Sequence, residues 1–167
     1  MKLKKMITIL CADKNSNYFK VHRAVNIFDE KRNAFTYEGT DRVIAHPPCA
    51  QWCRMKNFAN KSQVNIELAA FCIDKVKKNG GILEQPAGSS MFKYFGIKHN
   101  FSFYQCIFGY PAKKHTWLFT NNVYMLPLPV FKVHPGMQFK SNIQMTSTMR
   151  ARMPVSLCEY LIDSVSL

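Results

Sequence analysis

The residues best suited to chemistry lie in one short stretch, "VIAHPPCAQWCR", at Val43–Arg54. An apolar run leads into two prolines, and Cys49 follows them directly. A thiol that attacks carbon must be held on a stiff backbone, be partly exposed and lie in an electropositive setting. The prolines supply stiffness, while Arg54, Lys56 and the start of a following helix supply positive potential. The stretch therefore predicts that Cys49 is a nucleophile.

A carboxylic acid accompanies this thiol. Glu84 lies in "GILEQP", an apolar run that ends at Pro86 and reads as a strand. If this strand neighbours the one before Cys49, Glu84 is placed to exchange a proton with a bound heterocycle. Cys49 and Glu84 are therefore the candidate catalytic pair.

Two other interpretations of the cysteine stretch stay open. His46, Cys49 and Cys53 could bind zinc, but Cys-x₃-Cys without a second Cys/His pair at finger spacing is a weak zinc signal. No His-x-Glu signature of zinc deaminases precedes it either. We therefore expect no metal. The remaining alternative is a structural Pro-Pro turn that carries an incidental cysteine.

Strands and helices alternate along the first half of the chain. Lys5–Cys11 and Arg42–His46 read as buried strands, and Asn17–Glu30 places apolar residues at roughly helical spacing. Ser62–Asn79 is the clearest helix, with an apolar stripe, an N-cap serine and a Gly-Gly stop. "GILEQP" is the third strand of this half. The order predicts an α/β fold whose sheet is parallel in its first half.

The second half is richer in strands. Ser89–Phe95 reads as a short helix, and "FSFYQCIF" and "HTWLFTNN" are expected to form a hairpin. The proline-rich stretch Leu126–Gly136 is expected to cross the surface. Pro154 opens a last helix over Val155–Val165. We expect a β-rich C-terminal part within a single domain.

Three polar clusters follow three of these strands: "CADKN", "HPPCAQWC" and "EQPAGSS". In open α/β sheets, ligands bind at the carboxyl ends of the strands. The clusters are therefore expected to converge on one site.

The charge balance points to a polyanionic partner. The chain of 167 residues has 23 Lys and Arg against 10 Asp and Glu, a net charge of +13, and the basic residues are spread along it. A basic face on a folded body suits nucleic acid. A soluble protein with an incidentally high isoelectric point is the alternative.

Nothing in the sequence predicts a membrane protein. No apolar run approaches the roughly 18 residues that a span needs. "MKLKKMITILCADKN" resembles a signal peptide only in its basic end, because its apolar run is short and an aspartate follows. We expect a cytoplasmic protein. Of the six cysteines, those at 11, 72, 106 and 158 lie in apolar stretches and are expected to be buried and reduced.

The motifs together resemble a known family. "AHPPC", followed about 35 residues later by "LEQP", is similar to the catalytic core of cytosine-C5 DNA methyltransferases. The chain resembles most closely a group of short, phage-encoded methyltransferase-like proteins, through "IFGYPAKKHTWLF" at Ile107–Phe119 and "MRARMP" at Met149–Pro154. The resemblance covers roughly Arg42–Phe119. It implies a compact Rossmann-like, methyltransferase-like domain over residues 1–167, without a separate target-recognition domain.

The resemblance also implies a mechanism and a set of contacts. Cys49 would attack C6 of a cytosine, and Glu84 would hold N3 and the exocyclic amine, so that C5 can accept a methyl group from S-adenosylmethionine. Tyr110 is a further candidate for stacking on a flipped base. The residues expected to bind the cofactor are Cys11, Asp13, Asn15 and His46. Those expected to bind the substrate are Pro48, Gln51, Trp52, Gln85, Pro86, Lys113 and Lys114.

The cofactor half departs from the family pattern. "CADKNSN" contains no glycine, and the chain before Pro47 has room for little more than one helix. The family's second strand and its ribose-binding acid are therefore expected to be missing or reduced, with Glu38 and Asp41 as weak substitutes. The alternative function is a nucleic-acid-binding module that has lost the methyl-donor site and acts as a viral decoy or regulator in the host cytoplasm. A homodimer or a protein partner would then supply specificity.

Overall fold

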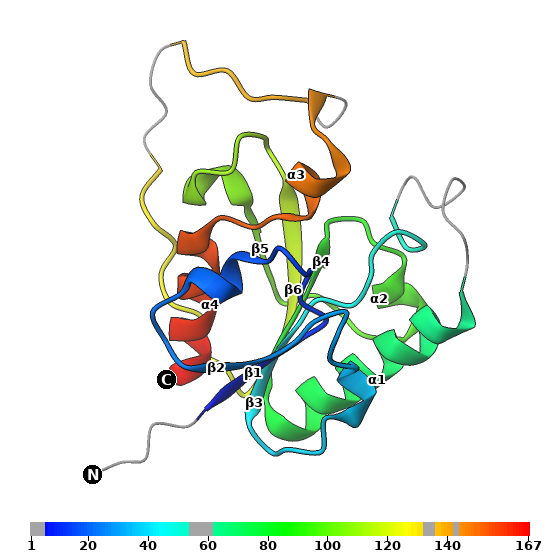
Figure 1. Ribbon diagram of the computed structural model, residues 1–167. Coiled ribbons are helices and arrows are strands. Elements are labelled where there is room, and N and C mark those ends of the chain that lie inside the picture. Colours follow the sequence, from blue (N-terminus) through cyan, green and yellow to red (C-terminus); the bar gives the residue numbers. More distant parts are fainter. Residues whose placement is uncertain (1–5, 54–61, 132–135, 142–143) are drawn as a thin grey trace.

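A six-stranded mixed sheet forms the centre of the molecule, with strand order β2-β1-β3-β4-β6-β5 (Figure 1). The computed structural model describes residues 6–53, 62–131, 136–141 and 144–167. The strands in chain order are β1 (Ile7–Leu10), β2 (Val25–Phe28), β3 (Arg42–Ala45), β4 (Gly81–Pro86), β5 (Phe101–Tyr104) and β6 (His115–Asn121). The predicted α/β class is confirmed.

The first four strands run parallel. β1 pairs with β2 on one side and with β3 on the other, and β3 pairs with β4. β6 is antiparallel to both β4 and β5. The expected hairpin is therefore present, although Gln105–Phe108, expected to extend its first strand, forms the 3₁₀ helix η4. The carboxyl ends of β1, β2, β3 and β4 meet at one edge of the sheet.

Helices cover both faces of the sheet, which is why its strands read as continuous apolar runs. α1 (Gln63–Asn79) covers one face and α4 (Val155–Ser166) covers the other (Figure 1). Side chains alternate between the two cores along each strand. Ile44 and Ile82 belong to the core under α4, whereas Val43 and Leu83 belong to the core under α1.

The helices begin and end largely where the sequence indicates. α1 ends at Gly80, whose φ of 80° lies in the left-handed region that favours glycine, and α4 begins directly after Pro154. Ser62 occupies the N-cap position of α1, but its side chain makes no capping hydrogen bond. Two short helices, α2 (Met91–Tyr94) and α3 (Ser147–Ala151), complete the set of α-helices in the described residues.

The prediction for Asn17–Glu30 was wrong. Asn17–Lys20 forms the 3₁₀ helix η1, and Val25–Phe28 forms strand β2 beside β1. Val25 and Ile27 are β-branched and pack against the core under α4, an environment in which a strand is favoured over a helix. A second 3₁₀ helix, η2 (Ala34–Thr36), follows. The second strand that the family resemblance led us to expect as missing or reduced is therefore present.

A small third core holds the segment around α3 onto the connection between η4 and β6. Tyr110, Ala112 and Met145 are buried together, with Met149 packed against them. The Tyr110 hydroxyl also donates to the main-chain oxygen of Met149 at 3.3 Å. In Figure 1 this segment (orange) lies beside the connection (yellow-green). Of the proline-rich stretch Leu126–Gly136, the described residues are mostly exposed, as expected of a surface crossing. No helix in the described ranges has the length and apolarity to cross a membrane.

Candidate functional site

A cavity of about 610 Å³ opens at the carboxyl ends of the parallel strands. The chain goes from β1 outward to β2 and then returns to the other side of β1 as β3, so the strand order reverses at this point. Such a reversal leaves a crevice outside the strand ends, which is where open α/β sheets bind ligands. Segments after β1, β2 and β3 line the cavity, as do the last residues of β4 and the region around Arg150. The three polar clusters of the sequence therefore converge.

Cys49 lines this cavity and is half-buried. Its carbonyl accepts hydrogen bonds from the main-chain N–H groups of Trp52 at 2.9 Å and Cys53 at 3.1 Å, which closes a tight turn after the two prolines. Cys53 does not line the cavity, and its thiol donates to the carbonyl of Ala50 at 3.4 Å. The turn separates the two thiols in position and surroundings.

Burial, and next the negative charge of Glu84, raise the pKa of the Cys49 thiol, while Lys114 acts in the opposite direction. With its pKa raised, Cys49 is a protonated thiol at neutral pH. Arg54 and Lys56, the expected source of positive charge, lie outside the described residues. A nucleophilic Cys49 therefore requires a base to remove its proton.

Glu84 is 8% exposed and lines the same cavity. Burial raises the pKa of its carboxyl, but the hydrogen bond from His46 and the charge of Lys114 outweigh burial, so that the pKa is lowered. One oxygen, Oε2, lies 3.1 Å from Nδ1 of His46. The other, Oε1, is buried and has no hydrogen-bond partner among the described residues. A buried carboxylate oxygen without a donor is costly, which makes Oε1 the natural acceptor for a ligand.

His46 connects Glu84 to Tyr18. Its Nε2 lies 3.0 Å from the hydroxyl of Tyr18, whose pKa is raised well above its usual value by burial and by the nearby Cys158 and Glu84. Because Tyr18 stays protonated, we assign it as the donor to Nε2, and Nδ1–H of His46 then donates to Glu84. His46 lines the cavity, but the structure places it as a support for Glu84.

Gln85 locks the cysteine turn to β4. Its amide nitrogen donates to the carbonyl of Pro47 at 2.7 Å, and its amide oxygen accepts from the Ser89 hydroxyl at 3.1 Å. The side chain is buried, so both bonds are protected from water. Gln85, Pro48 and Pro86 all line the cavity.

The loop after β1 supplies part of the expected cofactor set. Cys11 and Asp13 line the cavity, whereas Asn15 is exposed and does not; its main-chain N–H donates to Asp13 at 2.8 Å. Cys11 has a φ of 60°, in the left-handed region, so this loop turns sharply without a glycine. Its sulfur lies 3.6 Å from that of Cys72, and none of the six cysteines forms a disulfide. Cys11 is half-buried rather than buried.

Sequence reasoning missed two acids that follow β2. Asp29 and Glu30 line the cavity, and Asp29 Oδ1 accepts from the main-chain N–H groups of Lys31 and Arg32. The expected substitutes lie elsewhere: neither Glu38 nor Asp41 lines the cavity, and Asp41 accepts from the Thr8 hydroxyl at 3.3 Å. The available signal was an aspartate, Asp29, directly after the strand Val25–Phe28. It was missed because the apolar spacing in Asn17–Glu30 predicted a helix.

Several residues expected to bind substrate lie away from the cavity. Trp52 is 6% exposed and packs against Tyr94 and Phe95 in the core under α1. Gln51 is buried and accepts from the main-chain N–H of Ser62 at 3.1 Å. Lys113 lines a separate hollow, and Tyr110 is buried in the third core. Trp52 is therefore packed in the core under α1 and does not line the cavity.

Lys114, one of the two lysines expected to bind substrate, lies at the cavity. It lines the cavity together with Arg150, which lies in the "MRARMP" motif but was given no role from the sequence. The Lys114 ammonium donates to the main-chain oxygen of Arg150 at 3.0 Å, which ties β6 to α3. The cavity is therefore acidic beside β1 and β2 and basic beside β6.

Among the described residues, no group of three metal-ligating side chains converges. No protein-family model matches the chain, and no curated protein matches it. The site must therefore be interpreted from its own geometry.

Proposed function

We propose that this protein modifies a cytosine of a nucleic acid or nucleotide at C5, with Cys49 as nucleophile and Glu84 as acid–base group. The observation that carries the proposal is Glu84 Oε1. This oxygen is buried and has no hydrogen-bond partner among the described residues, and Glu84 lines the same cavity as Cys49. A cytosine ring in the cavity would donate its exocyclic N–H to this oxygen.

The ionisation of the pair suits this chemistry. In the free protein Cys49 is a thiol and Glu84 a carboxylate, because the pKa of the first is raised and that of the second lowered. The thiol proton passes to Glu84 and from there to N3 of the ring. The sulfur bonds to C6, the C5=C6 electron pair moves to C4–C5, and the C4=N3 pair moves to N3. The product is an enamine that is nucleophilic at C5.

Supports around the pair serve the same reaction. His46 orients Glu84 through Oε2 and leaves Oε1 for the ring. Gln85 donates to the Pro47 carbonyl and so holds the loop that carries Cys49 close to β4, the strand that carries Glu84. Lys114 and Arg150 suit the phosphate of a nucleotide substrate.

The residues on the β1–β2 side fit S-adenosylmethionine. An acid after the second strand of a Rossmann-like unit suits ribose hydroxyls, and Asp29 and Glu30 are in that place. Asp13 adds a negative charge for a ligand that carries a sulfonium and an ammonium group. When bound there, S-adenosylmethionine would supply the methyl group for C5. The reversal of strand order between β1 and β3 supports a Rossmann-like, methyltransferase-like classification.

A covalent trap tests the proposal. DNA containing 5-fluorocytosine, incubated with the protein and S-adenosylmethionine, should give an adduct detectable by intact-protein mass spectrometry, because fluorine blocks loss of the C5 proton. Cys49→Ser should abolish the adduct, and the matched control Cys53→Ser should retain it. Glu84→Gln should slow its formation by about 10²–10⁴-fold, the usual effect of a positioned acid–base group.

Two outcomes would contradict the proposal. An adduct that depends on Cys53 would mean that the nucleophile is misassigned. DNA binding without any adduct, and without affinity for S-adenosylmethionine, would favour the binding module that has lost its methyl-donor site.

A further inference from the structure

A second hollow, of about 460 Å³, lies beside the cavity and plays no part in the chemistry above. It is lined by Ala112, Lys113, Phe139, Lys140 and Ser141. The hollow and the cavity share one loop, because Lys113 lines the hollow and the next residue, Lys114, lines the cavity. Ligand groups bound in the two places would therefore be close neighbours.

The hollow combines an aromatic ring with positive charge. The Lys113 ammonium lies over the Phe139 ring, 5.4 Å from its centroid, and Lys140 is exposed. No acidic residue lines it among the described residues. Proteins that bind single-stranded nucleic acid use this combination: bases stack on the aromatic ring, and lysines bind the backbone phosphates.

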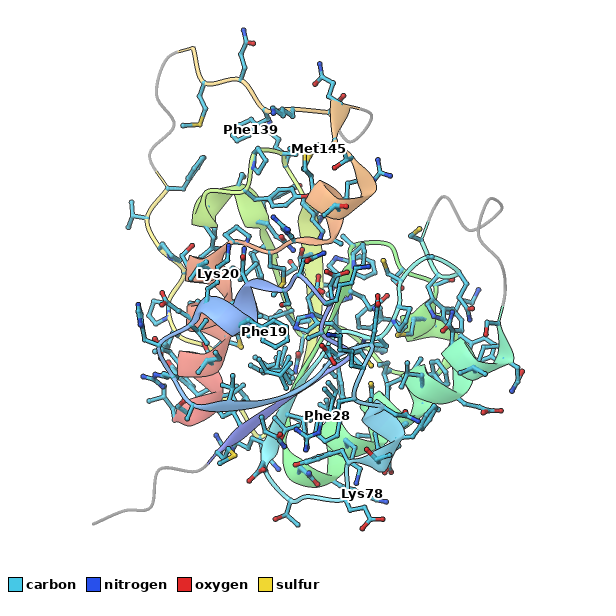
Figure 2. The ribbon with its side chains drawn as sticks, viewed as in Figure 1. Phe19, Lys20, Phe28, Lys78, Phe139 and Met145 are labelled. Atoms are coloured by element: carbon cyan, nitrogen blue, oxygen red, sulfur yellow. The ribbon has the colours of Figure 1, made fainter. Side chains whose placement is uncertain are left out.

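The hollow is anchored to the body of the protein. The main-chain N–H of Lys140 donates to the carbonyl of Pro111 at 2.8 Å. Ala112, which lines the hollow, is also buried in the third core with Tyr110 and Met145. Figure 2 shows Phe139 and Met145 in the same part of the molecule, at the opposite end from Lys78. The hollow is therefore held in place by hydrogen bonding and by packing against the third core.

We propose that this hollow binds the unpaired nucleotide adjacent to the target cytosine, so that the substrate is a single-stranded or locally opened nucleic acid strand rather than a mononucleotide. The inference rests on the proposed function, in which the cavity holds the target base. The adjacent base takes the place of the Lys113 ammonium over the Phe139 ring, and Lys113 and Lys140 neutralise its phosphates. The net charge of +13 suits a polyanionic strand.

Fluorescence anisotropy with a short labelled DNA strand, and competition by deoxycytidine monophosphate, test this inference. Phe139→Leu, which keeps an apolar side chain, should weaken strand binding by about 5- to 100-fold, the usual loss of one stacked base. Phe139→Tyr should retain binding. Both variants should leave the affinity for the mononucleotide unchanged, and circular dichroism should check that both are folded.

The lysines are tested through salt. Replacing Lys113 and Lys140 with Gln should lower the slope of log K against log[salt] by about 0.7 for each phosphate that is no longer neutralised. Lys78→Gln is the control, because Lys78 is exposed on α1 and pairs with Asp74. Equal strand affinity for Phe139→Leu and the unmodified protein would overturn the inference, and so would an equal loss of strand and mononucleotide binding. Strand binding that depends on Phe139, without an adduct at Cys49, would overturn only the proposed reaction.

Discussion

The charge of Glu84 affects the ionisation of Cys49 across the cavity. Burial and next the Glu84 carboxylate raise the pKa of the Cys49 thiol, and Lys114 acts to lower the pKa of both groups. The free protein therefore holds its thiol protonated beside a charged carboxylate. A bound ring that takes up the thiol proton would leave Cys49 as a thiolate.

Alkylation of Cys49 should report this coupling. With iodoacetamide at constant, mildly alkaline pH, Glu84→Gln should make Cys49 react faster, because loss of the negative charge lowers its pKa and increases the thiolate fraction. Lys114→Gln should make it react more slowly. Peptide mass spectrometry would measure both rates, with Cys53 in the same samples as the internal control.

Glu84→Gln is expected to raise the rate of Cys49 alkylation and to lower the rate of adduct formation, so the two measurements together test the role of Glu84. Faster alkylation together with slower adduct formation is the result expected of a group that acts on the ring. If both rates fall, Glu84 affects only the folding of the turn, and its acid–base role is wrong.

At the scale of elements, the contact between β3 and β4 positions Cys49 and Glu84, the candidate catalytic pair. Gly81 pairs with Val43 at the start of β4, three residues before Glu84. A Cβ at Gly81 would lie 1.9 Å from the Val43 carbonyl oxygen, and its φ is 140°. Only glycine permits this approach.

Gly81→Ala should therefore separate β3 from β4 and destabilise the protein by more than about 4 kcal/mol, in the range of the largest single-residue effects. Gly88→Ala is the matched control. Gly88 also has a positive φ, of 81°, but nothing lies within 4 Å of its Cβ position. It should cost about 1–2 kcal/mol, the usual penalty for a side chain in the left-handed region. Urea unfolding would compare the two, and equal losses would contradict the steric explanation.

At the scale of the whole molecule, the strand order separates the charges of the cavity. Asp13, Asp29 and Glu30 follow β1 and β2 on one side, whereas Lys114 and Arg150 lie towards β6 on the other. A cationic cofactor and an anionic substrate would each meet the opposite charge.

S-adenosylmethionine should therefore raise the melting temperature, by an amount that grows with its concentration, because a ligand that binds only the folded state stabilises it. Asp29→Asn should reduce this shift; the amide keeps an oxygen for the Lys31 and Arg32 N–H groups. Glu38→Gln, which is exposed and away from the cavity, should not reduce it. Differential scanning fluorimetry would measure the shifts, and an equal effect of both substitutions would contradict the assignment of Asp29.

The sequence by itself determined the elements with strong local signals. α1 has its apolar stripe and Gly80 stop, β4 has its apolar run, and the turn at Cys49 follows from two prolines. Cys49 and Glu84 could be placed together because Cys49 follows β3 and Glu84 lies near the end of β4, and the carboxyl ends of parallel strands share an edge.

The tertiary structure alone decided the rest. Val25–Phe28 forms a strand because it pairs with β1 and packs against the core under α4. No local pattern in Asn17–Glu30 encodes these contacts. Trp52 and Gln51 were drawn inward by packing, although they lie within a few residues of Cys49. Asp29, Arg150 and Phe139 reach their places through contacts between segments far apart in the chain. Such contacts depend on how whole elements pack against one another, so they cannot be predicted from the spacing of residues along the sequence.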